Sequence, residues 1–79
     1  MPDIRKIGSR IKTLRTDHKM TQAELAKQLG ITRQAVCNYE TGDSVPSDEI
    51  KVAIARLFKT SIESIFFADE VNKKNTKEL

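Results

Sequence analysis

The chain has 79 residues and a net charge of +3, which fits one small domain. A domain of this size buries only about 60–65% of its unfolded surface, so it depends on dense packing or on a partner subunit, a metal or disulfides. One Cys and one His exclude an internal disulfide and a structural zinc site. The sequence has no signal peptide and no apolar run of about 18 residues, and we therefore expect a cytoplasmic protein without a membrane span.

Basic residues gather in the first half of the chain. Between Arg5 and Asn38 there are eight Lys and Arg against two acids, whereas six bases and six acids follow residue 43. This asymmetry favours a phosphate-rich partner such as nucleic acid, with a merely solvated basic face as the simpler alternative.

The first predicted element is an amphipathic helix over residues 4–18. Ile4, Ile7, Ile11 and Leu14 recur there at helical spacing. Gly8 lowers helix propensity inside this segment, and we expect it where another helix packs closely.

Two short helices follow, and both have visible start and stop signals. Thr21 is a good N-cap, Glu24 completes a capping box, and Gly30 ends the helix. Thr32 caps the second helix without an acidic third residue, and Gly42 is its stop.

The rest of the chain predicts two further helices and a tail. Ser47 caps a helix whose apolar residues form a wide core stripe, and Ser61 starts the short helix "SIESIFF". We expect a domain over residues 1–67 and a polar tail over 68–79, either frayed or extending the last helix. No segment alternates as a strand, so the predicted class is all-α. The core stripe of the helix that Ser47 caps consists of Ile50, Ala53, Ile54, Leu57 and Phe58.

The two short helices form a helix-turn-helix, in which a tight turn with a Gly joins helices that cross. Ala26 is small where the second helix crosses, and Gly30 permits the turn. Leu25, Leu29 and Val36 fill the angle between the helices.

The second of these helices has two different faces when it is plotted at about 100° per residue. Ala35, Val36 and Tyr39 face the body of the domain. Arg pairs with guanine, and Gln and Asn pair with adenine, so the outward side suits base edges better than water alone. The outward residues are Arg33, Gln34, Cys37, Asn38 and Thr41.

Residues from about 4 to 67 resemble the Cro and lambda-repressor-like (Xre-type) helix-turn-helix regulators. The signature is "MTQAELAKQLGITRQAVCNYETG" followed by "PSDEI" and "LFKTSIESIF". The resemblance implies a compact five-helix DNA-binding domain that places residues 32–40 in the major groove. It also implies a regulator of a bacterial or phage type, which is associated with the nucleoid when it is bound to DNA. Two positions depart from the family: Asp43 stands where many relatives carry Lys or Arg, and Lys59 replaces a common Gly.

The resemblance also implies roles for individual residues. Arg33, Gln34 and Asn38 occupy base-reading positions, and Arg15 and Glu40 match a structural ion pair. Gln22 contacts phosphate and braces residue 33. Thr41 and Ser44 either donate to phosphates or satisfy the turn. The residues assigned to DNA-backbone or supporting roles are Gln22, Thr32, Cys37, Thr41, Ser44 and Lys12.

Two residue roles have alternative readings at the level of sequence. Cys37 is either a small residue that fits beside DNA or a thiol that senses oxidation. Ile62, Ile65 and Phe66 can complete the core, and together with Phe67 they are assigned to a two-fold dimer interface. No nucleophile–base–orienter set is evident, so we expect no enzymatic activity, no cofactor, no metal and no small-molecule ligand.

We therefore expect a sequence-specific transcriptional regulator that binds double-stranded DNA as a homodimer. A repressor that reads an inverted-repeat operator is the leading hypothesis. An antitoxin or coactivator-like protein-binding module on the same fold is the alternative, and the two can overlap.

Overall fold

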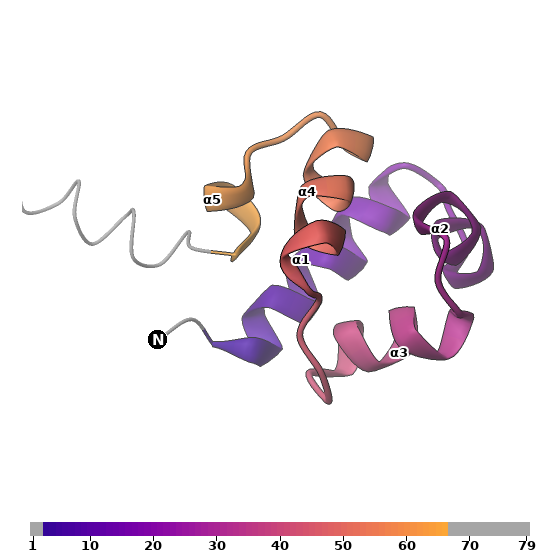
Figure 1. Ribbon diagram of the computed structural model, residues 1–79, viewed down its shortest axis with the longest axis horizontal. Coiled ribbons are helices and arrows are strands. Elements are labelled where there is room, and N and C mark those ends of the chain that lie inside the picture. The colour runs from indigo at the N-terminus through magenta and orange to yellow at the C-terminus, as the bar shows by residue number, and fades with distance from the viewer. Residues whose placement is uncertain (1–2, 67–79) are drawn as a thin grey trace, which may run out of the picture.

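The computed structural model describes residues 3–66, in which five helices are joined by turns and short loops and no strand is present (Figure 1). This confirms the predicted all-α class and the predicted order of elements. Phe67 and the predicted tail over 68–79 lie outside the described residues. The helices are α1 (Ile4–Asp17), α2 (Gln22–Leu29), α3 (Arg33–Thr41), α4 (Asp48–Leu57) and α5 (Ile62–Phe66).

Hydrogen-bonding caps start the first four helices. The Thr21 hydroxyl accepts from the Glu24 backbone N–H at 3.0 Å, and the Glu24 carboxylate accepts from the Thr21 N–H at 2.8 Å, which is the predicted capping box. The Thr32 and Ser47 hydroxyls cap α3 and α4, as predicted, by accepting from the backbone N–H groups of Ala35 and Ile50. Asp3, which the sequence analysis did not single out, caps α1.

Left-handed residues end the helices. Gly30 and Gly42 have φ of 69° and 86°, so both predicted stop glycines adopt the conformation that L side chains rarely take. Lys19 and Lys59 adopt similar φ values of 56° and 53° after α1 and α4. The Gly that Lys59 replaces would therefore suit this position better.

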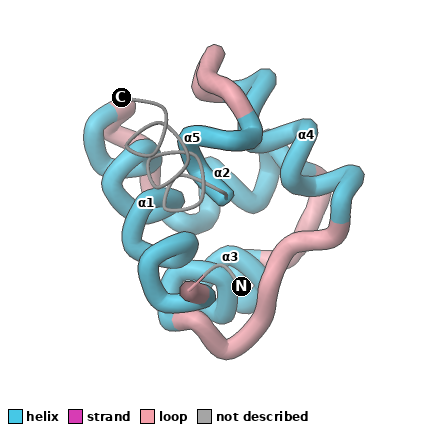
Figure 2. Tube along the Cα trace, turned by 90° about the vertical axis from the view of Figure 1, so that its left-hand side faces the viewer, coloured by secondary structure: helices cyan, strands magenta, loops and turns pink. Residues whose placement is uncertain are grey.

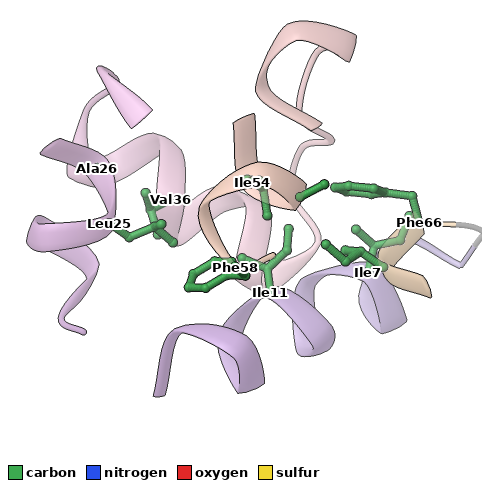
Figure 3. Close-up of a cluster of buried hydrophobic side chains, with 10 residues drawn as sticks. Ile7, Ile11, Leu25, Ala26, Val36, Ile54, Phe58 and Phe66 are labelled. Atoms are coloured by element: carbon green, nitrogen blue, oxygen red, sulfur yellow. The ribbon is translucent and has the colours of Figure 1, made fainter. Parts of the chain in front are cut away.

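One hydrophobic core runs beneath all five helices (Figure 3). One end fills the angle between α2 and α3, the middle joins α1 to α4, and the other end lies under α5. This continuity ties the helix-turn-helix to the rest of the domain. Along this line lie Leu25, Ala26 and Val36, then Ile11, Ile54 and Phe58, and finally Ile7 and Phe66.

The structure corrects several sequence-based assignments. Ile4 is 42% exposed because it stands at the first turn of α1, outside the cluster that begins with Ile7. Ala55 is buried although it lies outside the predicted stripe, because α4 packs on both α2 and α5. Ile65 and Phe66 are only 1% exposed, so within the single chain they complete the core, and their assignment to a dimer interface stays a prediction.

None of the helices described between residues 3 and 66 is long and apolar enough to cross a membrane. Membrane insertion of a helix needs about 20 apolar residues, more than the longest helix here provides.

Candidate nucleic-acid interface

Helix α3 runs along one edge of the molecule, joined to α2 by a tight turn (Figure 1). The second view places α3 at the same edge, away from α5 (Figure 2). Helices α1 and α2 both pack on α3. One face of α3 is therefore held by the domain while the other is open to a partner.

A close backbone approach fixes the second half of α3 to α1. A Cβ atom built on Gly8 would lie 2.4 Å from the Tyr39 carbonyl oxygen and 2.5 Å from that of Glu40. No side chain fits at that distance, so only Gly lets the two helices meet here. The expectation that Gly8 marks a close helix packing is confirmed.

A buried ion pair forms a second link between the same helices. Arg15 Nε donates to Glu40 Oε2 at 2.6 Å, and Arg15 Nη2 donates to Glu40 Oε1 at 3.1 Å. The side chains are 11% and 4% exposed, respectively. Arg15 Nη1 also donates to the Met20 carbonyl oxygen at 2.8 Å, so three of its nitrogens are engaged. The pair implied by the family resemblance is present.

Gln22 joins this network through its side-chain amide. Its Nε2 donates to Glu40 Oε1 at 3.2 Å, so Gln22 braces Glu40. The resemblance had implied that Gln22 braces residue 33. The difference follows from Glu40, whose buried carboxylate needs several donors to offset its lost hydration.

The network sets the charge that α3 presents. The hydrogen bond to Glu40 raises the pKa of Arg15, and the nearby Glu40 charge adds to this, while burial opposes it. Glu40 is the single acidic residue of α3, and it is paired inside the domain. The exposed side of α3 therefore carries no free carboxylate to repel phosphates.

The predicted outward residues lie together on the open face of α3. Arg33, Gln34 and Thr41 are exposed, whereas Cys37 and Asn38 are half-buried. On the opposite face Val36 is buried, with Ala35 and Tyr39 half-buried beside it. The exposed fractions agree with the helical wheel for Arg33, Gln34, Thr41 and Val36, whereas Cys37 and Asn38 are half-buried like the inward residues.

Two of the predicted base-reading residues contact each other. Gln34 Nε2 donates to Asn38 Oδ1 at 3.0 Å. This bond was not predicted from the sequence, although the spacing of four residues on a helix contained the signal. Gln34 and Asn38 therefore form one connected polar group on the open face.

The end of α3 is occupied by turn hydrogen bonds. The Thr41 hydroxyl contacts the Asn38 carbonyl oxygen at 3.3 Å and Asp43 Oδ2 at 2.9 Å. The backbone N–H groups of Asp43 and Ser44 donate to the same Asn38 carbonyl at 2.9 and 3.2 Å. Thr41 therefore satisfies the turn, and a phosphate contact from Thr41 or from the exposed Ser44 stays a prediction.

A shallow hollow of about 430 Å³ opens at the start of α2. The first N–H groups of a helix lack partners inside the helix and favour anions. Arg33 projects from α3 into the lining of the same hollow. The position suits a phosphate of the DNA backbone, whereas Lys12 is exposed on α1 and is not part of this lining. The lining residues are Arg15, Met20, Thr21, Gln22, Ala23 and Arg33.

Comparison with known proteins gives a consistent family. A helix-turn-helix family model matches residues 11–65. An uncharacterised HTH-type transcriptional regulator from Archaeoglobus fulgidus is 44% identical over 62 residues, covering 78% of this chain and 87% of that protein. The structure of the P22 c2 repressor in complex with a synthetic operator aligns with a TM-score of 0.73 and 27% identity, covering 76% of this chain and 91% of the repressor.

One relative carries a different kind of name. The antitoxin PezA from Streptococcus pneumoniae is 38% identical over 65 residues, which cover 82% of this chain but only 41% of PezA. The residues that match the family model, 11–65, include the whole helix-turn-helix. The chain therefore belongs to the helix-turn-helix family of Xre, Cro and lambda-repressor-like transcriptional regulators.

Proposed function

We propose that this protein is a sequence-specific DNA-binding regulator, acting as a dimeric repressor, that inserts α3 into the major groove. The observation that carries the proposal is the arrangement of α3. Arg33 and Gln34 are exposed on a helix whose single acid, Glu40, is paired in the interior. Such a face combines base-edge chemistry with no repulsion from phosphates. The proposed role is binding, without enzymatic activity.

Affinity and choice of sequence are assigned to different parts of the surface in this proposal, and Arg33 lies where the two parts meet. The hollow at the start of α2 accepts a backbone phosphate, which fixes the register of the protein without reading sequence. Arg33 suits guanine, since its two donors match the N7 and O6 acceptors. Asp43, exposed just after α3, disfavours a phosphate contact from that turn.

We place the proposed dimer interface on the α5 side of the domain, away from α3. The P22 c2 repressor, which is similar in fold, was solved with an operator, and repressors of this type bind two half-sites about 34 Å apart. Ile62 is half-buried on α5 and can contact a second copy of the chain, whereas Ile65 and Phe66 are buried in the core. We assign the remaining apolar contact to Phe67.

In vitro selection from random double-stranded DNA, combined with a solution mass measurement, tests the proposal. We expect enrichment of two inverted half-sites and a mass of two chains. Enrichment of a single half-site by a monomer would exclude the proposed dimer. No enrichment at all would exclude sequence-specific binding. The Phe67→Asp variant should be monomeric, and a dimeric variant would exclude Phe67 from the interface.

The similarity to PezA supports a second candidate function, an antitoxin or other protein-binding module. An antitoxin that also binds DNA would satisfy both proposals. The discriminating experiment is to mix the purified chain with the product of the adjacent gene and to measure the mass. A stoichiometric complex would favour the second function, and unchanged masses would disfavour it.

A further inference from the structure

The hydrogen bond between Gln34 and Asn38 joins an exposed side chain to a half-buried one. Gln34 lies at the start of the open face of α3, and Asn38 lies one turn later. The bond runs from Gln34 Nε2 to Asn38 Oδ1 at 3.0 Å. An exposed Gln otherwise samples many rotamers, so this bond selects one direction for the Gln34 amide.

Asn38 is a firm support because its backbone is fixed. Its carbonyl oxygen accepts from the N–H groups of Asp43 and Ser44 and from the Thr41 hydroxyl. These bonds use the main chain, so they leave the Asn38 side chain to hold Gln34. Its partial burial also restricts how far its own amide can reach.

The bond changes which base Gln34 can pair with. A primary amide has two N–H donors and one carbonyl acceptor. Adenine needs one donor at N7 and one acceptor for its N6 amino group, whereas guanine offers two acceptors at N7 and O6 and needs two donors. With one N–H given to Asn38, Gln34 keeps the set for adenine and loses the set for guanine.

We propose that Gln34 and Asn38 act as one reading unit, in which Gln34 selects adenine over guanine and Asn38 is the positioning residue that enforces the choice. The inference rests on the proposed DNA-binding function and assigns a narrower role to Asn38 than direct base reading. It names the target of the unit as one A·T pair in each half-site.

The test is in vitro selection with the full chain and its Gln34→Ala, Asn38→Ala and Asn38→Asp variants. Gln34→Ala should lower the preference for adenine at one position by roughly ten- to a hundredfold, as expected for one bidentate contact. Asn38→Ala should lower it at the same position by roughly three- to tenfold, since a single supporting hydrogen bond is lost. Guanine should become tolerated there because Gln34 regains its second donor.

Asn38→Asp is the matched variant that separates support from reading. The carboxylate keeps an acceptor for Gln34 but has no N–H to offer a base. We expect weaker overall affinity from the added negative charge, with the adenine preference retained. Loss of the preference in Asn38→Asp would overturn the positioning role.

Two other results would contradict the inference. If Asn38→Ala relaxed a different base pair from Gln34→Ala, the two residues would read independently. If Asn38→Ala left all preferences unchanged, Asn38 would support nothing. Absence of any enriched sequence with the unmodified chain would instead remove the proposed function, so the two failures are distinguishable. Arg33→Ala serves as the control, because it should relax a separate position and leave the adenine preference intact.

Discussion

Helices α3 and α5 both pack on α1, but they are held by different kinds of contact. α3 is fixed by a backbone approach at Gly8 and by the buried pair of Arg15 and Glu40. α5 is held by apolar burial of Ile65 and Phe66, by a hydrogen bond from Arg10 to the Ile65 carbonyl oxygen at 3.1 Å, and by Lys51, whose Nζ lies 5.5 Å from the Phe66 ring centroid.

The difference matters because apolar contacts have little directional preference, whereas a bidentate ion pair and a close backbone contact do. A helix that pairs with base edges must be held in one orientation, with its side chains positioned to within about 0.5 Å. The directional contacts are concentrated on the helix for which we propose that role. Changes on the α3 side should therefore alter stability and DNA reading together, and changes on the α5 side should alter stability alone.

The largest effect is expected for Glu40→Ala. The change leaves Arg15 buried without its partner, and such losses cost about 3–5 kcal/mol of the free energy of unfolding. Urea denaturation measures the effect. Glu63→Ala is the control, since this exposed acid on α5 should change stability by less than about 0.5 kcal/mol. A loss of only about 1 kcal/mol in Glu40→Ala would show that the pair does not anchor α3.

Gly8→Ala should follow, at about 2–3 kcal/mol, because the added methyl meets two carbonyl oxygens of α3. The atoms it meets are backbone, which cannot rotate away as a side chain would. Thermal unfolding by circular dichroism checks the result. The neighbouring Ser9→Ala change places the same residue on an exposed face, so it should be neutral or slightly stabilising.

Ile65→Val tests the α5 side and should cost about 1 kcal/mol of stability through one lost buried methyl group. The base preferences found by in vitro selection should not change, because α5 makes no directional contact with α3. A shifted preference would mean that the apolar side also orients the reading helix.

Lys59→Gly should stabilise the protein by about 1 kcal/mol, since Lys59 has a left-handed φ of 53° before α5. The matched change Lys12→Gly, on an exposed part of α1, should destabilise by about 1 kcal/mol. Denaturant titrations should give changes of opposite sign in the free energy of unfolding for the two variants, as expected if the left-handed φ of Lys59 is the cause. Changes of the same sign would exclude this cause.

The smallest effect concerns acid stability at the start of α2. Hydrogen bonds from the Thr21 N–H and hydroxyl lower the pKa of Glu24 below its ordinary value of 4.5. The unfolded chain then binds the proton more readily, so the stabilisation is full above pH 4.5 and is lost as pH falls through the lowered value. Glu24→Gln keeps a capping partner that does not titrate. Its melting temperature should fall less on acidification than that of the unmodified chain, and an equal fall would exclude Glu24 as the cause.

Local chemistry made much of the fold predictable from sequence. The caps at Thr21, Thr32 and Ser47 and the stops at Gly30 and Gly42 each depend on a few neighbouring residues, so the helix bounds were predictable. The pair of Arg15 and Glu40 joins residues 25 positions apart and came from the family resemblance alone.

The other features of the site depend on how deeply each side chain is buried and on where it points, and a helical wheel does not give this information. The wheel placed Asn38 on the outward side next to Gln34, but it did not give the half burial of Asn38. The burial of Ile65 and Phe66 was one of two readings that the sequence left open, because the position of α5 over the core is a tertiary property. The bond from Gln22 to Glu40 was likewise not predicted, because it depends on how α2 and α3 are placed against each other, and the phosphate contact of Gln22 stays a prediction.

The contact at Gly8 has a consequence for engineering the protein. The residues that fasten α3 and the residues that we propose to read DNA are different sets, since Gly8, Arg15 and Glu40 face inward while Arg33 and Gln34 face outward. Exposed substitutions away from such anchoring features usually change stability by less than about 0.5 kcal/mol. The outward positions can therefore be exchanged to redirect the protein to new operators without redesigning the scaffold that carries them.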